Sequence, residues 1–199
     1  MTMIKFGNYF RCQIIRHYSS SYKWSYVSGP SDLPLIGSTL GQVIDHSAEK
    51  YGNQIALTSM HQGPVRKSFE DVQEDSNKLA AGLLSLGLRP GDRIGIWGPN
   101  SYEWYQTQMA SAQAGLILVN VNPAYKSHEL KYCINKVEIK ALVSARKFKT
   151  SDYYEKLCEL VDDKDTLKGD GIPSLEHVIM MKHSDFNDQA KYVKIKKKD

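Results

Sequence analysis

Residues 90–104 read PGDRIGIWGPNSYEW, and this stretch decides the fold of the sequence. The opening Pro-Gly-Asp has the composition of a tight turn, because proline presets the backbone and glycine tolerates unusual conformations. Arg93–Trp97 is then a short apolar run, and Gly98-Pro99-Asn100 breaks the chain directly after it. Turn, strand and break are therefore the predicted structure of this stretch.

A helix and a second strand are expected next. Asn100 and Glu103 have the three-residue spacing of a helix-capping pair, and Gly115 is placed to end that helix. The buried face of the helix is expected at Tyr105, Met109 and Ala112. Leu116–Val121 is a nearly continuous apolar run, which is typical of a strand covered on both faces. Strand, helix and strand in this order indicate parallel strands.

The rest of the body repeats the alternation. Helices are expected to begin at capping pairs or polar turns, namely Thr39 with Gln42, Ser68 with Asp71, Ser127, and Asp152 in a helix reaching Val161. Strands are expected at Ile55–Ser59, Val65–Ser68, Lys140–Ser144 and Leu175–Met181. Helical spacing predicts buried faces at Leu40, Val43, Ile44, Ala48 and Tyr51, and at Leu130, Ile134 and Val137. The predicted fold class is α/β, a parallel sheet flanked by helices.

The net charge of +4 comes entirely from the N-terminus. Residues 1–31 contain four basic residues, no acidic residue and six serines, and the rest of the chain is formally neutral. The body therefore offers little general attraction to a phosphate backbone, and no nucleic-acid partner is expected. No apolar run approaches the ~20 residues that span a bilayer, so no transmembrane segment is expected.

Residues 1–31 are predicted to be a mitochondrial presequence. On a helix, Met3, Phe6, Phe10 and Ile14 fall on one face, with basic residues on the other, as import recognises. Residues 16–19 read RHYS, which resembles a presequence cleavage pattern with the cut after Tyr18. The predicted location is the mitochondrial matrix. The alternative is a basic tail without a targeting function.

Motifs that carry chemistry on their own are absent. No GxxxxGK[ST] loop, GxSxG elbow or HExxH motif occurs. The three cysteines, Cys12, Cys133 and Cys158, lack metal-ligand spacing and are interpreted as reduced thiols. No catalytic, cofactor-binding or metal-binding residue is assigned in this chain.

Ligands of open parallel sheets bind beyond the carboxyl ends of the strands. Binding loops are therefore expected at Gly98–Ser101 and Asn122–Tyr125, and Tyr125 is a candidate for lining a ligand channel. His46, on the expected solvent side of its helix, is interpreted as a surface residue. The tryptophans Trp97 and Trp104 are interpreted as core residues.

The segment from Asp32 to about Lys182 resembles the start of the AMP-forming acyl-CoA synthetases, the superfamily that includes luciferases and coumarate ligases. Each matching block is short, and their order and spacing carry the resemblance. The blocks are Thr39-Leu40, Ala56-Leu57, Ser68–Val72, Leu79–Gly87, Pro90–Ile96, Asn100–Trp104, Ala114-Gly115, Val119–Tyr125 and Glu129-Leu130. The runs Gly98–Trp104 and Asn120–Tyr125, with the presequence, are most similar to the mitochondrial medium-chain acyl-CoA ligases.

The resemblance implies ATP-dependent activation of a fatty acid. In that superfamily a carboxylate attacks ATP to give an acyl-adenylate, and coenzyme A then displaces AMP, with Mg²⁺ as the metal ion. The family's Ser/Thr/Gly-rich phosphate loop ending in Pro-Lys, and its catalytic lysine, have no counterpart in these 199 residues. Residues 32–182 thus correspond to the first, incomplete subdomain of the family's N-terminal domain, which is expected to be inactive alone and to bind no cofactor.

Three interpretations stay open. The chain is the N-terminal part of such a ligase, or a non-catalytic truncated isoform that binds the full-length ligase or another partner, or an independent small domain with a function of its own. Residues 183–199 form a lysine-rich tail that does not resemble the family and is interpreted as a solvated segment.

Overall fold

The structure is a computed structural model that describes residues 29, 32–60, 62–161 and 171–181. Residue contacts divide the chain into two units, Met1–Gly37 and Ser38–Asp199. Nearly all of the expected presequence and the whole lysine-rich tail lie outside the described residues. In the first unit, the described side chains of Leu33, Leu35 and Ile36 are exposed.

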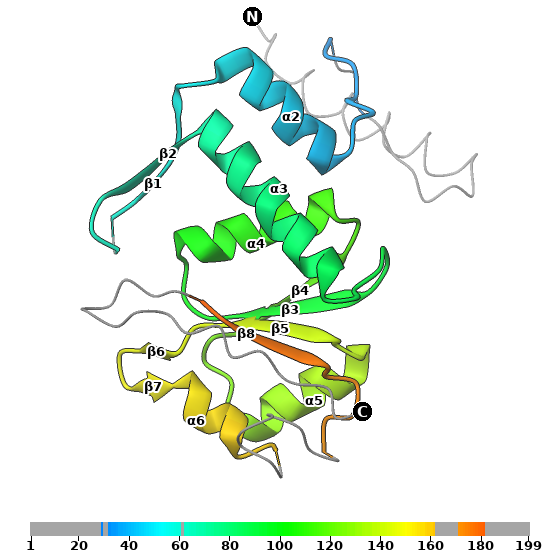
Figure 1. Cartoon of the computed structure of the whole chain (residues 1–199), viewed down its shortest axis with the longest axis vertical. Coiled ribbons are helices and arrows are strands. Elements are labelled where there is room, and N and C mark those ends of the chain that lie inside the picture. Colours follow the sequence, from blue (N-terminus) through cyan, green and yellow to red (C-terminus); the bar gives the residue numbers. More distant parts are fainter. Residues whose placement is uncertain (1–28, 30–31, 61, 162–170, 182–199) are drawn as a thin grey trace, which may run out of the picture. The chain divides into compact units, whose positions relative to one another are not determined.

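The second unit is built on a four-stranded parallel sheet with the strand order β4-β3-β5-β8 (Figure 1). Its strands are β3 (Arg93–Trp97), β4 (Ile117–Val121), β5 (Ala141–Ser144) and β8 (His177–Met180). Because β3 lies between β4 and β5, its register fixes both neighbours, with Trp97 opposite Val121 on one side and Ser144 on the other.

Helices cover both faces of this sheet. One side carries α3 (Phe69–Ser85) and α4 (Tyr102–Gln113), with α2 (Leu40–Tyr51) packed on both of them. The other carries α5 (Ser127–Val137) and α6 (Tyr153–Cys158) (Figure 1). The predicted α/β class, a parallel sheet flanked by helices, is confirmed.

Two short antiparallel hairpins complete the described elements. The first, β1 (Ile55–Ser59) with β2 (Val65–Ser68), has the bounds that the sequence predicted. The second, β6 (Lys147–Phe148) with β7 (Ser151–Asp152), was not predicted. Lys149 at its turn has φ 52°, a left-handed conformation that glycine or asparagine usually marks in a sequence.

The helix starts are confirmed where the cap and its partner are close in sequence. The Thr39 hydroxyl accepts a bond from the Gln42 N–H at 3.2 Å, and the Gln42 side chain bonds back to the Thr39 N–H at 2.9 Å. Ser68 and Asp71 make the same reciprocal pair at the start of α3. Each pair satisfies two N–H groups that a helix start leaves open.

Other expectations about the helices were wrong. The cap of α4 is Ser101 rather than Asn100, because the Ser101 hydroxyl accepts from the Trp104 N–H at 3.1 Å. The buried face of α4 is offset from the predicted one and consists of Tyr102, Thr107, Ala110 and Ser111. In α2 only Ile44 and Ala48 of the predicted stripe are buried, whereas Leu40, Val43 and Tyr51 are exposed, as is Val137 in α5. The Tyr51 ring keeps one contact, with Phe69 of α3 at 5.2 Å between centroids. Four predicted segments are shorter than expected: β4 and β5 each begin one residue later, and α6 and β8 are shorter at both ends.

The prediction that Leu116–Val121 is covered on both faces was also wrong. In the described part of the chain, β4 pairs with β3 alone and forms an edge of the sheet. Leu116 and Val121 are buried, but Ile117 is 52% exposed and Asn120 is exposed. An apolar sequence therefore occupies a partly exposed edge.

Asp92 joins two segments at the start of β3 and β5. Its carboxylate accepts from the Arg89 N–H at 2.9 Å and pairs with Lys140 Nζ at 2.7 Å. The hydrogen bond from Lys140, together with that from the Arg89 N–H, holds the pKa of Asp92 below its ordinary value. The charged form of Asp92 is therefore favoured in the folded chain.

We expect Asp92→Asn to lower the free energy of unfolding by about 1–2 kcal/mol at neutral pH, because Lys140 loses its carboxylate partner. The contribution of Asp92 is complete above the ordinary pKa of 3.8 and is lost as the pH falls through the lower folded-state pKa. Urea unfolding of both proteins, at neutral pH and at about pH 2, measures this. A difference between the two proteins that does not shrink in acid would contradict the ion-pair role.

Gly95 lies at the middle of the central strand, where an added side chain would press on buried side chains. A Cβ built there would approach Leu142 Cδ1 to 2.8 Å and Ile139 Cδ1 to 3.1 Å. Ile94, Ile96, Ile139 and Leu142 are all fully buried around this point. Gly95 therefore allows close packing over β3 in the middle of the core.

We expect Gly95→Val to lower the free energy of unfolding by about 1–3 kcal/mol, because the added methyl groups overpack the core. A matched control is Gly82→Ala on α3, where a Cβ meets nothing within 4 Å. That control should be neutral or stabilising by up to about 1 kcal/mol, since alanine favours a helix. Urea midpoints compare the variants, and equal stability of Gly95→Val and the wild type would exclude overpacking.

Candidate functional site

The loops after β3 and β4 lie side by side at the carboxyl edge of the sheet. Trp97 and Val121, the last residues of these strands, are register partners. The loops that follow, Gly98–Ser101 and Asn122–Tyr125, are those where the sequence predicted ligand binding. The parallel pairing thus brings together two segments more than twenty residues apart, at the edge where open α/β sheets bind ligands.

The side chain of Trp97, at the end of β3, connects the two loops. Its indole N–H donates to the Asn122 carbonyl oxygen at 3.0 Å, and its side chain is fully buried. Its ring meets Tyr153 of α6 edge-on, with 4.6 Å between centroids. The interpretation of Trp97 as a core residue is confirmed, and Trp104 packs against the same core while partly exposed.

The loop after β3 is also held against the end of β5. Gly98 lies so close to Ala145 that an added Cβ would stand 2.9 Å from the Ala145 Cβ. The Ala145 N–H donates to the Trp97 carbonyl at 2.9 Å. Neither contact partner is the end of a flexible side chain, so this approach requires glycine at position 98.

The loop after β4 is shaped by its own asparagine. The Asn122 side-chain oxygen accepts from the Ala124 N–H at 2.9 Å, and the Asn122 carbonyl accepts from the Tyr125 N–H at 3.0 Å. Tyr125 is half-buried and packs against the core. Its role in lining a ligand channel stays a prediction.

Lys156 is a residue of this edge that the sequence did not single out. Its Nζ lies 3.4 Å from both the Tyr125 carbonyl and the Ser151 hydroxyl, and over the rings of Trp97 and Tyr153 at 5.9 and 5.6 Å. None of the ion pairs among the described residues includes it. Two of its partners, Trp97 and Tyr125, lie 59 and 31 residues away in sequence. No local pattern in the sequence could therefore have identified Lys156 as a residue of this edge.

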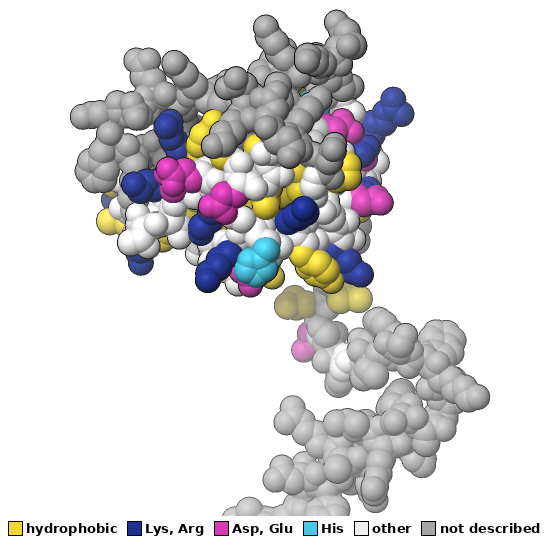
Figure 2. All heavy atoms as spheres, turned by 90° about the horizontal axis from the view of Figure 1, so that it is seen from below, with side chains coloured by type: hydrophobic (Ala, Val, Ile, Leu, Met, Phe, Trp, Pro, Cys, Tyr) yellow, Lys and Arg dark blue, Asp and Glu magenta, His cyan; other side chains and the backbone are white. Residues whose placement is uncertain are grey.

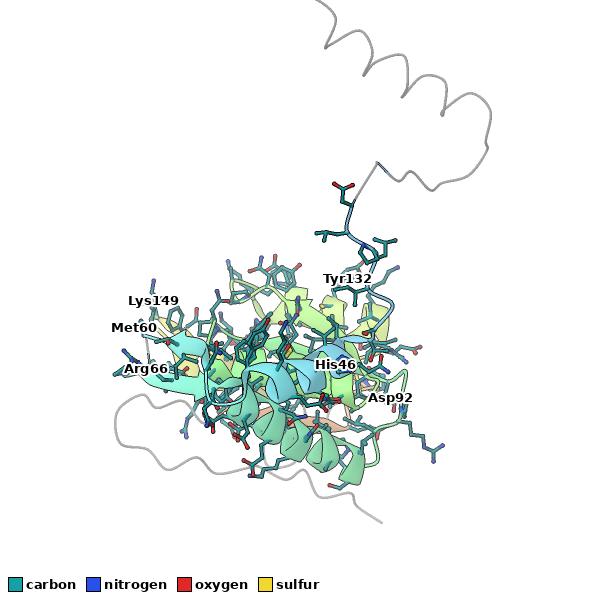
Figure 3. All side chains as sticks on the ribbon, turned by 90° about the horizontal axis from the view of Figure 1, so that it is seen from above. His46, Met60, Arg66, Asp92, Tyr132 and Lys149 are labelled. Carbon is teal, nitrogen blue, oxygen red and sulfur yellow. The ribbon has the colours of Figure 1, made fainter. Side chains whose placement is uncertain are left out.

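Gln62, in the turn of the β1–β2 hairpin, is a second residue that sequence reasoning missed. Its side-chain oxygen accepts from the Tyr102 N–H at 2.8 Å, and its amide nitrogen donates to Glu103 at 2.6 Å. In Figure 3, Met60 and Arg66 of this hairpin and Lys149 of the second hairpin lie at the end of the molecule opposite Asp92. Since Asp92 precedes β3, the hairpin turn lies toward the carboxyl edge.

The remaining candidates lie away from this edge. His46 is exposed on α2, as predicted, and Figure 3 shows it on the outer helix. Its neighbour Asp45 accepts hydrogen bonds from Gln73 and Gln113, which links α2 to α3 and α4. A shallow hollow lined by Arg93, Asn135 and Lys140, among others, lies at the amino edge of the sheet, the edge opposite the expected site.

The electrostatics of the described residues show no preorganised acid–base pair at the loops. Burial raises the pKa of Tyr153, so its phenol stays neutral under the indole. Burial likewise raises the pKa of the Cys133 thiol, and Cys133 and Cys158 are both free thiols. Within the described segments, no three His, Cys, Asp or Glu side chains are grouped as metal ligands.

Surface charge is mixed rather than segregated. Figure 2 views the face that carries α5 and α6, where basic and acidic side chains alternate over the visible part. The described side chains visible in this view thus form no extended basic patch.

None of the described helices has both the length and the apolar character needed to cross a membrane.

Comparison with known proteins places these loops in a family. The sequence model of the family described as AMP-binding enzyme matches residues 44–199. The mouse and human mitochondrial medium-chain acyl-CoA ligases ACSF2 are 43% and 44% identical to this chain over 160 residues, or 78% of it. The chain spans about a quarter of the length of these relatives, 26% in both cases.

Solved structures agree. A long-chain-fatty-acid-CoA ligase from Archaeoglobus fulgidus is 27% identical and superimposes with a TM-score of 0.64, covering 79% of this chain and 30% of that one. The acetoacetyl-CoA synthetase of Streptomyces lividans, at 20% identity and a TM-score of 0.64, shows the same fold over 76% of this chain and 23% of its own. With the family match spanning more than half of its residues, the chain belongs to the AMP-binding enzyme family.

Proposed function

We propose that this chain is the N-terminal part of an ATP-dependent fatty acyl-CoA ligase that activates medium-chain fatty acids. The observation that carries the proposal is the identity of 43% with the mouse mitochondrial medium-chain acyl-CoA ligase over 160 residues. The fold supports it, since the matched residues form an α/β sheet whose two ligand-edge loops lie side by side. The acyl chain length is inferred from the relatives alone.

The reaction proposed for the complete enzyme has two steps. The fatty acid carboxylate attacks the α-phosphate of ATP, which releases pyrophosphate and gives an acyl-adenylate. The thiolate of coenzyme A then attacks the acyl carbon and displaces AMP. Such steps need Lys or Arg side chains, backbone amides and Mg²⁺ around the phosphates, and we assign no described residue of this chain to that role.

The contribution proposed for this chain is therefore positional. Trp97 and Gly98 hold the loop after β3 against Asn122 and Ala145. That arrangement gives a rigid wall at the carboxyl edge, against which the catalytic part of a ligase could close. ATP, Mg²⁺ and coenzyme A would be bound chiefly by that other part.

We expect purified chain, given ATP, Mg²⁺, coenzyme A and octanoate, to release no AMP above a buffer blank in a coupled assay. The human relative ACSF2, assayed in parallel, serves as the positive control. Octanoate-dependent AMP release by this chain would contradict the proposed absence of catalytic residues. Inactivity of both proteins would instead show that the assay conditions are wrong.

We also propose that residues 1–31 are a mitochondrial presequence ahead of a first subdomain at 32–182, with residues 183–199 as a basic tail. The basic, acid-free composition of residues 1–31 supports this, as do the mitochondrial relatives. The proposed location is the matrix.

We expect a fusion of residues 1–31 to a fluorescent protein to co-localise with a mitochondrial marker, because a cationic amphipathic helix is imported. A matched control replaces Lys5 and Arg16 with glutamate, which reverses two of the four basic charges of the segment without changing its length. Diffuse cytosolic fluorescence of the unaltered fusion would refute the targeting proposal.

A second candidate function is a non-catalytic chain that associates with the full-length ligase. The edge strand β4 favours it, because Ile117 is 52% exposed and the strand carries no charged residue or proline to protect its edge. Co-purification of the tagged chain with full-length ligase from mitochondria would support this function. Recovery of the chain without the ligase would contradict this second function, and only the proposal that the chain is the N-terminal part of a ligase would remain.

A further inference from the structure

The β1–β2 hairpin contacts the start of α4 at two residues, Tyr102 and Glu103, and Tyr102 makes most of the contacts. Tyr102 is the first residue of α4 and directly follows the loop Gly98–Ser101. Its N–H belongs to the group that a helix start leaves without an intrahelical partner. The Ser101 hydroxyl serves the Trp104 N–H, so the Tyr102 N–H is satisfied by Gln62, forty residues earlier in the chain.

The side chain of Tyr102 is held from the same hairpin. Its hydroxyl donates to Asp75 of α3 at 2.6 Å, and Lys67 of β2 pairs with the same carboxylate oxygen at 2.7 Å. Lys67 Nζ also lies over the Tyr102 ring, 5.0 Å from its centroid. Tyr102 is only 7% exposed. The base and the turn of the hairpin therefore both converge on one residue.

These contacts favour a charged Asp75 carboxylate and a neutral Tyr102 phenol. Burial raises the pKa of Asp75, but the hydrogen bonds from Lys67 and Tyr102 outweigh it, so the pKa lies below the ordinary range. Burial, and then the bond to Asp75, raises the pKa of Tyr102 far above that of a free tyrosine. The phenol stays a donor and the carboxylate an acceptor at any physiological pH.

The other end of the loop is fixed independently. Gly98 packs on Ala145, and the Trp97 carbonyl accepts the Ala145 N–H. The four residues from Gly98 to Ser101 thus run between two anchors, one from β5 and one from the hairpin. A two-stranded hairpin is marginal by itself. Here β2 runs directly into α3, and Lys67 and Gln62 also bind the hairpin to α3 and α4.

We propose that the β1–β2 hairpin is a clamp for the loop after β3, with Gln62 as the positioning residue at its turn. The inference rests on the proposed function for its purpose, since that function places the loop at the ligand edge. Gln62 touches no substrate in this role and acts through Tyr102 and Glu103. The clamp makes a segment far upstream in sequence responsible for the conformation of the ligand-edge loop.

The test is hydrogen–deuterium exchange of the complete chain, read on peptides that cover residues 98–104. Gln62→Ala should speed exchange there about fivefold or more, because it removes both side-chain hydrogen bonds between Gln62 and α4. Gln73→Ala is the matched control, because the Gln73 side chain also bonds to another element, from α3 to Asp45 of α2 at 2.7 Å, but away from this loop. Exchange of residues 98–104 should be unchanged in that control, and thermal midpoints report overall stability for both.

A double substitution that swaps the donor and the acceptor separates a positioning role of Gln62 from a general loss of packing. Gln62→Glu sets a second carboxylate against Glu103 and should also speed exchange of the loop. Adding Glu103→Gln restores one donor and one acceptor with their places reversed, and should return the loop to wild-type exchange. Rescue supports the clamp even if Gln62→Ala lowers overall stability.

Wild-type exchange of residues 98–104 in Gln62→Ala, or failure of the double variant to rescue Gln62→Glu, would overturn the inference. Exchange is measured without any ligand, so its result does not depend on the chemistry of the enzyme. The AMP-release assay bears on the proposed function alone. Failure of the clamp and failure of that function are therefore distinguishable.

Discussion

The pairing of β3 with a parallel strand on each side is the constraint on which the rest of this structure depends. β3 is five residues long, and four of them, Gly95 included, are buried. Its register with β4 sets Trp97 beside Val121, and its register with β5 sets Trp97 beside Ser144. Three chain segments consequently end at one edge, and the loops there inherit their positions from the backbone hydrogen bonds of the sheet.

Close packing at β3 carries this constraint outward to the helices. The absent side chain of Gly95 lets Leu142 and Ile139 approach the strand. Ile94 and Ile96 flank that glycine and are fully buried, as are Leu130 and Ile134 of α5 and Ala110 of α4. A core this dense transmits small displacements instead of absorbing them. The position of the carboxyl-edge loops thus depends on residues buried in the core.

The sequence best predicted those features that depend on residues close together in the chain. Thr39 with Gln42 and Ser68 with Asp71 were identifiable because both partners of each capping pair lie three residues apart. Arg93–Trp97 was identifiable because a turn and a break enclose five residues, and the α/β class followed from the alternation. Asn100 and Ser101 show the limit of this reasoning, since either side chain could cap α4 and only the geometry selects Ser101.

What the sequence could not predict depends on contacts between distant segments. The apolar character of Leu116–Val121 predicts burial, but strand order decides whether such a segment lies inside a sheet or at its edge. Gln62 sits in a polar turn of ordinary composition, and its importance follows only from meeting Tyr102 in space. For Lys156 the same holds, because its partners come from β3, the loop after β4, β7 and α6. The family's chemistry is proposed to reside in sequence beyond this quarter of its length, whereas the geometry of the carboxyl-edge loops is set by the described residues. In keeping with that proposal, most of the informative side chains in the described part are anchors rather than acids or bases.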